Sequence, residues 1–153
     1  MEVKLATAKD VPGLSALLSV LFAQEAEFRP DPAAQARGLS MILEDPGLGA
    51  VLVARDRDRP LGMVNLLYTV STALGCRVAL LEDMVVAADA RGRGIGGHLL
   101  TTAIAHARAA GCQRITLLTD SGNLSAQRFY RRHGFVSSPM LPMRLLLPQP
   151  AGE

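Results

Sequence analysis

The sequence lacks several features that would define its class at once. It has no tryptophan, two cysteines and only 4% aromatic residues among its 153. Cys76 and Cys112 have no metal-ligand spacing and make a poor disulfide framework, so we expect reduced thiols in buried strands. The N-terminus has no cationic segment followed by an apolar run, and residues 14–23 fall short of the ~20 apolar residues that cross a bilayer. We therefore expect a cytoplasmic protein without a membrane segment.

A strongly basic face is missing as well. The formal net charge is +2 and residues of both signs are interleaved, which argues against a nucleic-acid partner. His98, His106 and His133 have no further ligand at matching spacing, so we expect surface or capping roles and no bound metal. The length suits one domain, expected to span residues 1–148, with 149–153 as a flexible C-terminal end.

Hydrophobic periodicity predicts strands and helices along the whole chain. The predicted strands are residues 2–6, 49–54, 61–70, 77–86 and 113–119, one that begins at Phe135, and a closing strand over 140–147. The predicted helices are one that Asp10 caps and that runs through Leu14 and Phe22, residues 33–43, one that stops at Gly111, and one from Asn123 to Gly134. The charged turn over residues 55–60 is expected at the solvated tip of a hairpin.

A cluster of glycines and arginines organises the chain. Residues 91–97 follow a predicted strand and open a helix, whose first backbone N–H groups have no partners and carry the positive end of the helix dipole. Gly92, Gly94, Gly96 and Gly97 have no side chains to block a ligand. Because Arg91 and Arg93 add positive charge, the sequence predicts a site for an anionic cofactor tail. Strands 77–86 and 113–119 flank this helix and are expected to pair in parallel as a βαβ unit.

Three interpretations of these glycines compete. Gly92, Gly94 and Gly97 match the G-x-G-x-x-G turn of dinucleotide-binding proteins, for which Asp120 could supply the acidic residue. In that pattern the first glycine closely follows the strand, whereas five residues, 87–91, intervene here. The second interpretation is the spacing Arg91-x-x-Gly94-x-Gly96. The third is a plain glycine-rich connection with exposed arginines.

Two linked motifs carry a family resemblance. Leu81-Glu82-Asp83 through Gly97 is followed about 30 residues later by Asn123-x-x-Ala126-x-x-Phe129-Tyr130-x-x-x-Gly134-Phe135. Together they resemble the signatures of the GCN5-related N-acetyltransferases, the GNAT family. The resemblance implies an α/β (α+β) fold with a mixed, mostly antiparallel sheet of 6–7 strands and about four helices. It also implies an acetyl-CoA site where two strands splay apart.

The resemblance implies a set of residues that bind acetyl-CoA. The backbone of Met84, Val85 and Val86 would bond the acetyl group and the pantetheine amides as an added strand does. Asn123 would hydrogen-bond the pantetheine or cap the last helix. Tyr130 would lie near the cofactor sulfur and protonate the departing thiolate, unless it is only a core aromatic residue. The amides that would hold the pyrophosphate are those of Arg91, Gly92, Arg93, Gly94, Ile95, Gly96 and Gly97.

A general base is harder to assign from the sequence. Glu82 lies two and four residues before Met84 and Val86, so strand alternation places these three side chains on one face. Asp83 points the other way unless a bulge intervenes. The pair Glu82-Asp83 resembles the acidic pair that meets cationic substrates in some members of the family. Glu82 is the nearest candidate for the catalytic base that accepts the proton of an amine, with Asp83 or a water relay as the alternatives.

We interpret the chain as an acetyl-CoA-dependent N-acetyltransferase that acts directly on a primary amine, because no covalent nucleophile is evident at the acetyl site. The acceptor is left open among small amines, amino acids, antibiotics and proteins. Residues 21–43 and 137–143 are expected to set specificity, and the family resemblance also allows a homodimer. The alternatives are a catalytically silent acetyl-CoA sensor and, with less support, a dinucleotide-binding oxidoreductase module.

Overall fold

The chain divides into two compact units, Met1–Leu118 and Thr119–Glu153. The structure, a computed structural model, describes residues 1–25 and 27–149. The two units are treated separately below. Residues 150–153, most of the predicted flexible C-terminal end, lie outside the described residues.

The first unit contains a mixed sheet. Its strands are β1 (Glu2–Leu5), β2 (Gly49–Asp56), β3 (Arg59–Ser71), β4 (Cys76–Val86) and β5 (Ile115–Leu117). They lie in the order β1-β2-β3-β4-β5, and every neighbouring pair is antiparallel except β4 and β5, which run parallel. This confirms the mixed, mostly antiparallel sheet and the parallel pair. The five strands of the described residues are fewer than the 6–7 expected.

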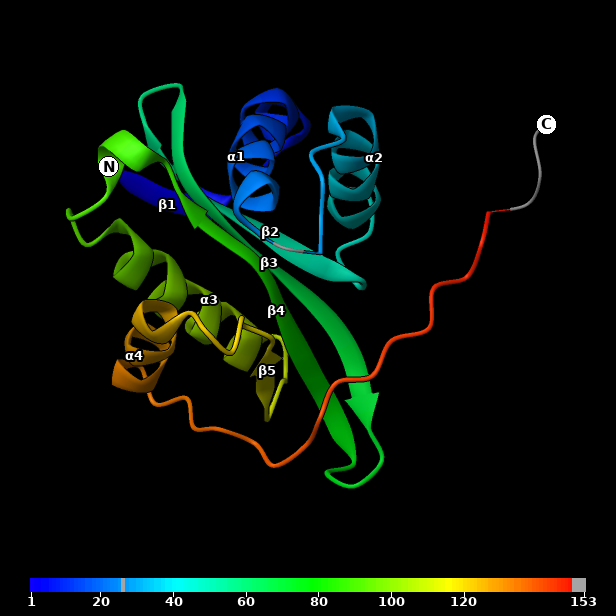
Figure 1. Cartoon of the computed structure of the whole chain (residues 1–153). Coiled ribbons are helices and arrows are strands. Elements are labelled where there is room, and N and C mark those ends of the chain that lie inside the picture. Colours follow the sequence, from blue (N-terminus) through cyan, green and yellow to red (C-terminus); the bar gives the residue numbers. More distant parts are fainter. Residues whose placement is uncertain (26, 150–153) are drawn as a thin grey trace. The chain divides into compact units, whose positions relative to one another are not determined.

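Three α-helices of the first unit cover the two faces of this sheet. They are α1 (Val11–Gln24), α2 (Pro32–Leu43) and α3 (Ile95–Ala109), and single 3₁₀ turns form at Ala8–Asp10 and Ala88–Ala90. Helices α1 and α2 lie side by side over one face, and α3 lies on the opposite face (Figure 1). Helix α2 begins where the Asp31 carboxylate accepts a hydrogen bond from the Ala34 N–H at 3.2 Å.

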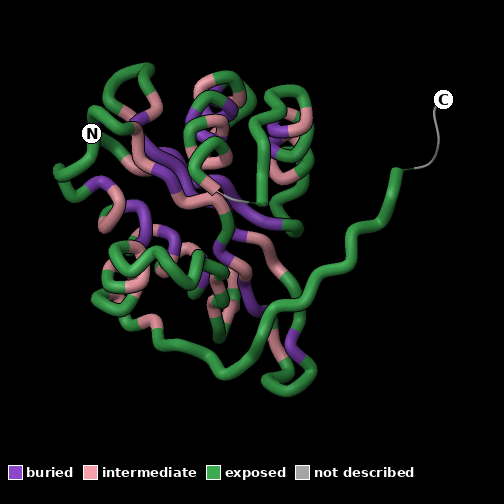
Figure 2. The backbone as a smooth tube through the Cα atoms, in the orientation of Figure 1, coloured by how far each residue is buried: buried purple, intermediate pink, exposed green. Residues whose placement is uncertain are grey.

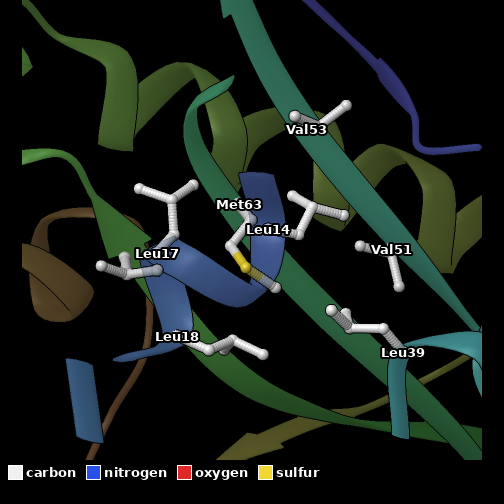
Figure 3. Packing of buried hydrophobic residues seen from close by; sticks show 8 residues of the cluster. Leu14, Leu17, Leu18, Leu39, Val51, Val53 and Met63 are labelled. Carbon is white, nitrogen blue, oxygen red and sulfur yellow. The ribbon is translucent and has the colours of Figure 1, made fainter. Parts of the chain in front are cut away.

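The main core lies between α1, α2 and the sheet. Figure 2 shows buried residues concentrated along the central strands and on the sides of the helices that face them. The cluster comprises Leu14, Leu17, Leu18, Leu39, Val51, Val53, Met63 and Val85, most of which Figure 3 labels. On the other face α3 packs closely on β3, because a Cβ added at Gly62 would lie 2.9 Å from Leu99 Cδ1. The same Cβ would lie 3.0 Å from the Val85 carbonyl oxygen, so this close approach favours glycine.

Asp10 has a different role from the one expected. Its carboxylate makes no capping bond to α1. Instead it accepts a hydrogen bond from the Thr7 N–H at 2.8 Å and lies 2.9 Å from Arg55 Nη1, and both charged side chains are largely buried. Arg55 thus belongs to the buried end of β2 rather than to the solvated turn. Loss of either partner would leave a buried charge uncompensated.

The second unit contains α4 (Leu124–Arg132) and no strand among its described residues. The predicted strands at Phe135 and over 140–147 are therefore wrong. Prolines 139, 142 and 148 lack the N–H that a sheet ladder needs. The large apolar side chains of this segment are 79–91% exposed: Val136, Met140, Leu141, Met143, Leu145, Leu146 and Leu147.

Two further expectations concern the thiols and the membrane. Cys76 and Cys112 are free and half-buried, but only Cys76 lies in a strand, because Cys112 occupies the loop between α3 and β5. In the described part of the chain, every helix is too short or too polar to span a bilayer.

Truncation of a core leucine tests the packing. Leu14 is completely buried, and Leu14→Ala should lower the free energy of unfolding by about 2–5 kcal/mol because a cavity remains. Val20 lies on the same helix and is 39% exposed, so Val20→Ala should change the free energy of unfolding by no more than about 0.5 kcal/mol. Denaturant titration measures both, and equal effects would contradict the assigned core face of α1.

Candidate active site

A bulge in β4 shapes the candidate site. Asn65 pairs with Glu82 and Met63 pairs with Val85, so Asp83 and Met84 together stand opposite the single residue between Met63 and Asn65. Asp83 has a φ of 54°, a left-handed conformation that is costly for most residues and better tolerated by aspartate. The alternation that grouped Glu82 with Met84 and Val86 therefore does not continue through this point.

The bulge places Asp83 on a cavity between β4 and the two leading helices. This cavity has a volume of about 290 Å³, and Asp83 lines it together with residues of α1, α2 and β3. Burial raises the pKa of Asp83 to about 6, and the negative charge of Glu82 adds to this increase. A hydrogen bond from Asn65 Nδ2 to the Asp83 carboxylate, 3.0 Å long, acts in the opposite direction. Glu82 itself is exposed.

Asn65 is a site residue that the sequence analysis missed. It is 3% exposed and lines the same cavity, and among the described residues its Oδ1 has no hydrogen-bond partner. An ionised carboxylate only accepts hydrogen bonds, so the amide nitrogen belongs beside Asp83 and the oxygen is left open. The sequence did contain a clue to this residue: Asn65 is the one amide side chain in the otherwise apolar run from Leu61 to Tyr68.

Within the first unit, no described strand pairs with β4 on this side beyond Leu81. Strand β5 pairs only with Ala79, Leu80 and Leu81. Farther along, the Ala87 N–H donates to Leu61 O of β3 at 2.7 Å, so alternation turns the polar backbone groups of Val86 away from β3. The Val86 carbonyl accepts a hydrogen bond from Arg91 Nε at 3.2 Å. The strand end thus offers backbone amides at a gap in the sheet, which is the geometry expected of splayed strands.

The glycine cluster forms the start of α3. Gly92 and Gly94 have φ values of 80° and 77°, and Gly94 is the N-cap of this 15-residue helix. A Cβ at either position would meet nothing within 4 Å, so these glycines serve backbone conformation rather than space. The N–H groups of Ile95, Gly96 and Gly97 open the helix and have no carbonyl one turn earlier to bond. These unpaired N–H groups can therefore donate hydrogen bonds to an anionic group of a ligand.

The loop before these glycines is held by hydrogen bonds. Arg93 Nη2 donates to Asp89 O at 3.2 Å, and Arg59 Nη2 lies 2.6 Å from Asp89 Oδ1. The hydrogen bond from Arg59 lowers the pKa of the Asp89 carboxyl. Arg59 is exposed at the β2–β3 hairpin, as expected, and also reaches this loop. Its pairing offsets the negative charge of Asp89, which precedes the predicted anion site.

Asn123 and Tyr130 lie in the second unit. Asn123 Oδ1 accepts a hydrogen bond from the Ala126 N–H at 3.1 Å, so Asn123 caps α4, one of the two roles considered for it. The Tyr130 ring makes edge-to-face contacts with Phe129 and Phe135, with ring centroids 5.3 and 5.8 Å apart. A part in catalysis for Tyr130 stays a prediction.

The histidines do not assemble into a site. His133 Nδ1 lies 2.9 Å from Phe129 O, a contact at the end of α4 that suits a capping role. His98 is exposed on α3. Within residues 1–25 and 27–149, no group of three or more histidine, cysteine or carboxylate side chains could hold a metal ion.

Comparison with known proteins establishes the family. Residues 14–135 match the model of the acetyltransferase (GNAT) family. The chain is 29% identical over 137 residues to the aminoalkylphosphonate N-acetyltransferase of Salmonella typhimurium, covering 90% of this chain and 86% of that protein. It is 29% identical over 124 residues to the uncharacterized N-acetyltransferase YhfO of Bacillus subtilis, covering 79% and 83%. An integron cassette protein from a salt-marsh metagenome has a similar structure, with 27% identity, a TM-score of 0.83 and coverage of 97% and 91%.

These observations define the class. The chain belongs to the GNAT family. It is an N-acetyltransferase with the mixed α/β fold of that family. The family assignment and the predicted fold class are thereby confirmed.

The raised pKa of Asp83 predicts a stability effect of Asp83→Asn. Because the pKa is about 6 in the folded protein against an ordinary 3.8, the folded state binds more protons between these values. Stability therefore falls as the pH rises through this window and does not recover above it. The asparagine variant cannot ionise, so at pH 7.5 it should be more stable than the wild type by up to about 3 kcal/mol.

Denaturant unfolding at two pH values measures this difference. The two proteins should have similar stability below pH ~3, where Asp83 is protonated in both the folded and the unfolded wild type. Glu82→Gln changes the exposed neighbour and should shift stability by less than about 0.5 kcal/mol. A lower stability of Asp83→Asn at pH 7.5 would rule out a buried, raised-pKa carboxyl.

Proposed function

We propose that the protein transfers the acetyl group of acetyl-CoA directly to a primary amine, with Asp83 as general base. One observation carries this proposal: a single stretch of β4 combines a half-buried carboxyl on a cavity with a strand end that no described strand of the first unit pairs beyond Leu81. The glycine turn at the start of α3 follows within a few residues. The name of the Salmonella relative describes transfer to an aminoalkyl compound, which supports an amine acceptor here.

The residues present suit the anionic tail of acetyl-CoA. Residues 91–97 contain two arginines and no acidic side chain, and Gly92 and Gly94 adopt the left-handed backbone that aims successive amides outward. The backbone of Met84, Val85 and Val86 would hold the pantetheine arm along the open edge of β4. Acetyl-CoA supplies the acetyl group as a thioester, a substrate rather than a resident cofactor.

Asp83 suits the removal of a proton from the amine. At neutral pH it is mostly ionised, yet its pKa of about 6 makes it a stronger base than an ordinary aspartate. An alkylammonium has a pKa near 10.4, and each unit that separates it from the base costs about 1.4 kcal/mol. The higher pKa of Asp83 therefore lowers this cost by about 3 kcal/mol. Glu82 is exposed and is assigned to attraction of the cationic substrate.

The proton balance then involves two side chains. As the amine nitrogen forms a bond to the carbonyl carbon, the carbon–sulfur bond breaks. The substrate ammonium loses one proton to Asp83 before the attack, and the nitrogen loses a second proton to water as the amide forms. Asp83 then returns its proton to solvent, so one proton is released overall. Tyr130 donates its phenolic proton to the departing thiolate and later recovers one from solvent. The role of Tyr130 rests on the family resemblance alone.

Acetyl-CoA binding is tested by melting temperature. A ligand that binds only the folded state raises the unfolding free energy, by about 2.7 kcal/mol at one hundred times its Kd. We expect an increase with acetyl-CoA and none with NAD. Asparagine and aspartate both tolerate the positive φ of Gly94, so Gly94→Asn and Gly94→Asp differ mainly in charge. The aspartate variant should bind acetyl-CoA at least about tenfold more weakly than the asparagine variant.

A stabilising effect of NAD without one of acetyl-CoA would favour the dinucleotide interpretation instead. Equal acetyl-CoA affinity in the two Gly94 variants would show that the tail does not lie at this turn.

Tyr130→Phe tests the general acid. Loss of one acid or base contribution typically lowers turnover by ~10²–10⁴-fold, and the ring contacts with Phe129 and Phe135 survive in the variant. The rate of thiol release should fall, whereas the melting shift with acetyl-CoA should stay nearly unchanged. Phe129→Leu, on the neighbouring ring, controls for packing. Unchanged turnover in Tyr130→Phe would remove Tyr130 from the mechanism.

A further inference from the structure

We infer that the acceptor is a primary amine on a compact, uncharged apolar body. Its nitrogen would lie at Asn65 and Asp83, and its body would lie in the cavity between α1 and α2. This inference rests on the proposed function and specifies the substrate class of that site. It follows from the polar groups that the cavity leaves open, from its apolar wall and from its volume.

The polar end of the cavity is equipped to bind N–H donors. Asn65 Oδ1 is buried without a partner among the described residues, which is costly unless a ligand bonds it. Among the described residues, the Asp83 carboxylate accepts one side-chain hydrogen bond, from the same asparagine, and so keeps acceptor capacity. An ammonium group offers three N–H donors and a positive charge. These two side chains therefore complement a primary amine.

The other buried polar side chain of the cavity is already bonded. Gln35 Nε2 donates to Ser15 O at 2.9 Å and to Ser19 Oγ at 3.0 Å, which joins α2 to α1. Its Oε1 accepts a hydrogen bond from the Asp31 N–H at 2.7 Å. Gln35 is thus a structural clamp. Recognition of the nitrogen is left to Asn65 and Asp83.

The remaining wall is mostly apolar. It is formed by Leu18, Phe22, Phe28, Ala34, Gly38, Leu39 and Ile42. Two exposed side chains of opposite charge, Arg29 and Asp31, also line the cavity, so this outer part does not favour one sign of charge. A second ammonium would lose its hydration against the apolar wall, and a carboxylate beside the amine would approach Asp83. Diamines and α-amino acids are therefore disfavoured.

The volume indicates the size of the apolar body. An engineered cavity of ~150 Å³ in another protein binds benzene. The cavity here, about 290 Å³, is roughly twice as large. It accommodates a phenyl ring together with a two-carbon linker, so phenethylamine is a suitable probe.

Gly38 allows the cavity to be filled without disturbing the backbone. It lies in α2, lines the cavity, and has no atom within 4 Å of an added Cβ. Its φ lies outside the positive range that disfavours side chains. Leucine is also a better helix former than glycine. Gly38→Leu should therefore fold normally while it occupies part of the apolar space.

The experiment compares amines in a thiol-release assay with the full-length protein and acetyl-CoA. The probes are phenethylamine, n-hexylamine, ethylamine, 1,4-diaminobutane, glycine and 2-aminoethylphosphonate. Burial of one additional substrate methylene raises kcat/KM roughly fourfold. The kcat/KM for phenethylamine and n-hexylamine should therefore exceed that for ethylamine by at least about tenfold. The three probes with a second charge should fall below n-hexylamine by a similar factor.

Two matched variants test whether the apolar body of the amine binds in this cavity. Gly38→Leu should lower kcat/KM for phenethylamine by at least about tenfold and change that for ethylamine by less than about threefold. Ala33→Leu adds the same side chain to an exposed position of α2 outside the cavity and should leave both values unchanged. Phenethylamine should also raise the melting temperature of the wild type, and Gly38→Leu should abolish this shift.

The outcomes separate this inference from the proposed function. Faster turnover of glycine, diaminobutane or aminoethylphosphonate than of phenethylamine would overturn the apolar-body assignment while transfer to amines stands. An equal loss in Gly38→Leu and Ala33→Leu would also overturn it. If no amine releases thiol although phenethylamine still raises the melting temperature only when residue 38 is glycine, the cavity assignment holds and the transferase proposal fails.

Discussion

The bulge in β4 is the constraint on which the candidate site depends. A regular ladder would continue the alternation of side chains and direct Asp83 away from the α1 and α2 face. The two residues inserted opposite one place Asp83 against Asn65 and on the cavity, and they coincide with the point where β5 stops pairing. The cavity and the end of the pairing with β5 therefore lie within a few residues of one local irregularity. The positive φ of Asp83 is its conformational cost.

The sequence predicted the regular part of the fold, because there local pattern and tertiary packing agree. Alternation in the strands and the apolar stripe of α1 depend on neighbours in the chain, and the paired motifs around Gly94 and Tyr130 carried the family. The bulge could not be located, since it arises from a mismatch in pairing between β3 and β4. The Arg59–Asp89 ion pair was missed for the same reason, because its partners are 30 positions apart. The closing strands failed because apolar character was weighed above the missing N–H groups of the prolines.

The candidate site contains two polar groups that lower the stability of the folded protein. A carboxyl with its pKa raised to about 6 and an amide oxygen without a partner each lower stability. Both lie on one cavity, whereas the buried pair of Asp10 and Arg55, on another part of the sheet, is mutually satisfied. The Tyr68 hydroxyl is also buried without a partner among the described residues, but it does not line this cavity. The cavity is therefore the place where a raised carboxyl pKa and an open amide oxygen occur together.

The Gln35 clamp has a consequence for how the protein responds to temperature. Apolar contacts between helices weaken on cooling, so a cavity held open only by such contacts changes its width with the conditions. Here one amide joins α1 to α2, because Gln35 Nε2 donates hydrogen bonds to Ser15 O and Ser19 Oγ of α1, while its Oε1 accepts one from the Asp31 N–H at the start of α2. The spacing of the two helices is therefore set by geometry more than by solvent. A cavity bounded by such a bonded side chain should keep its width on cooling better than one between helices joined by apolar contacts alone.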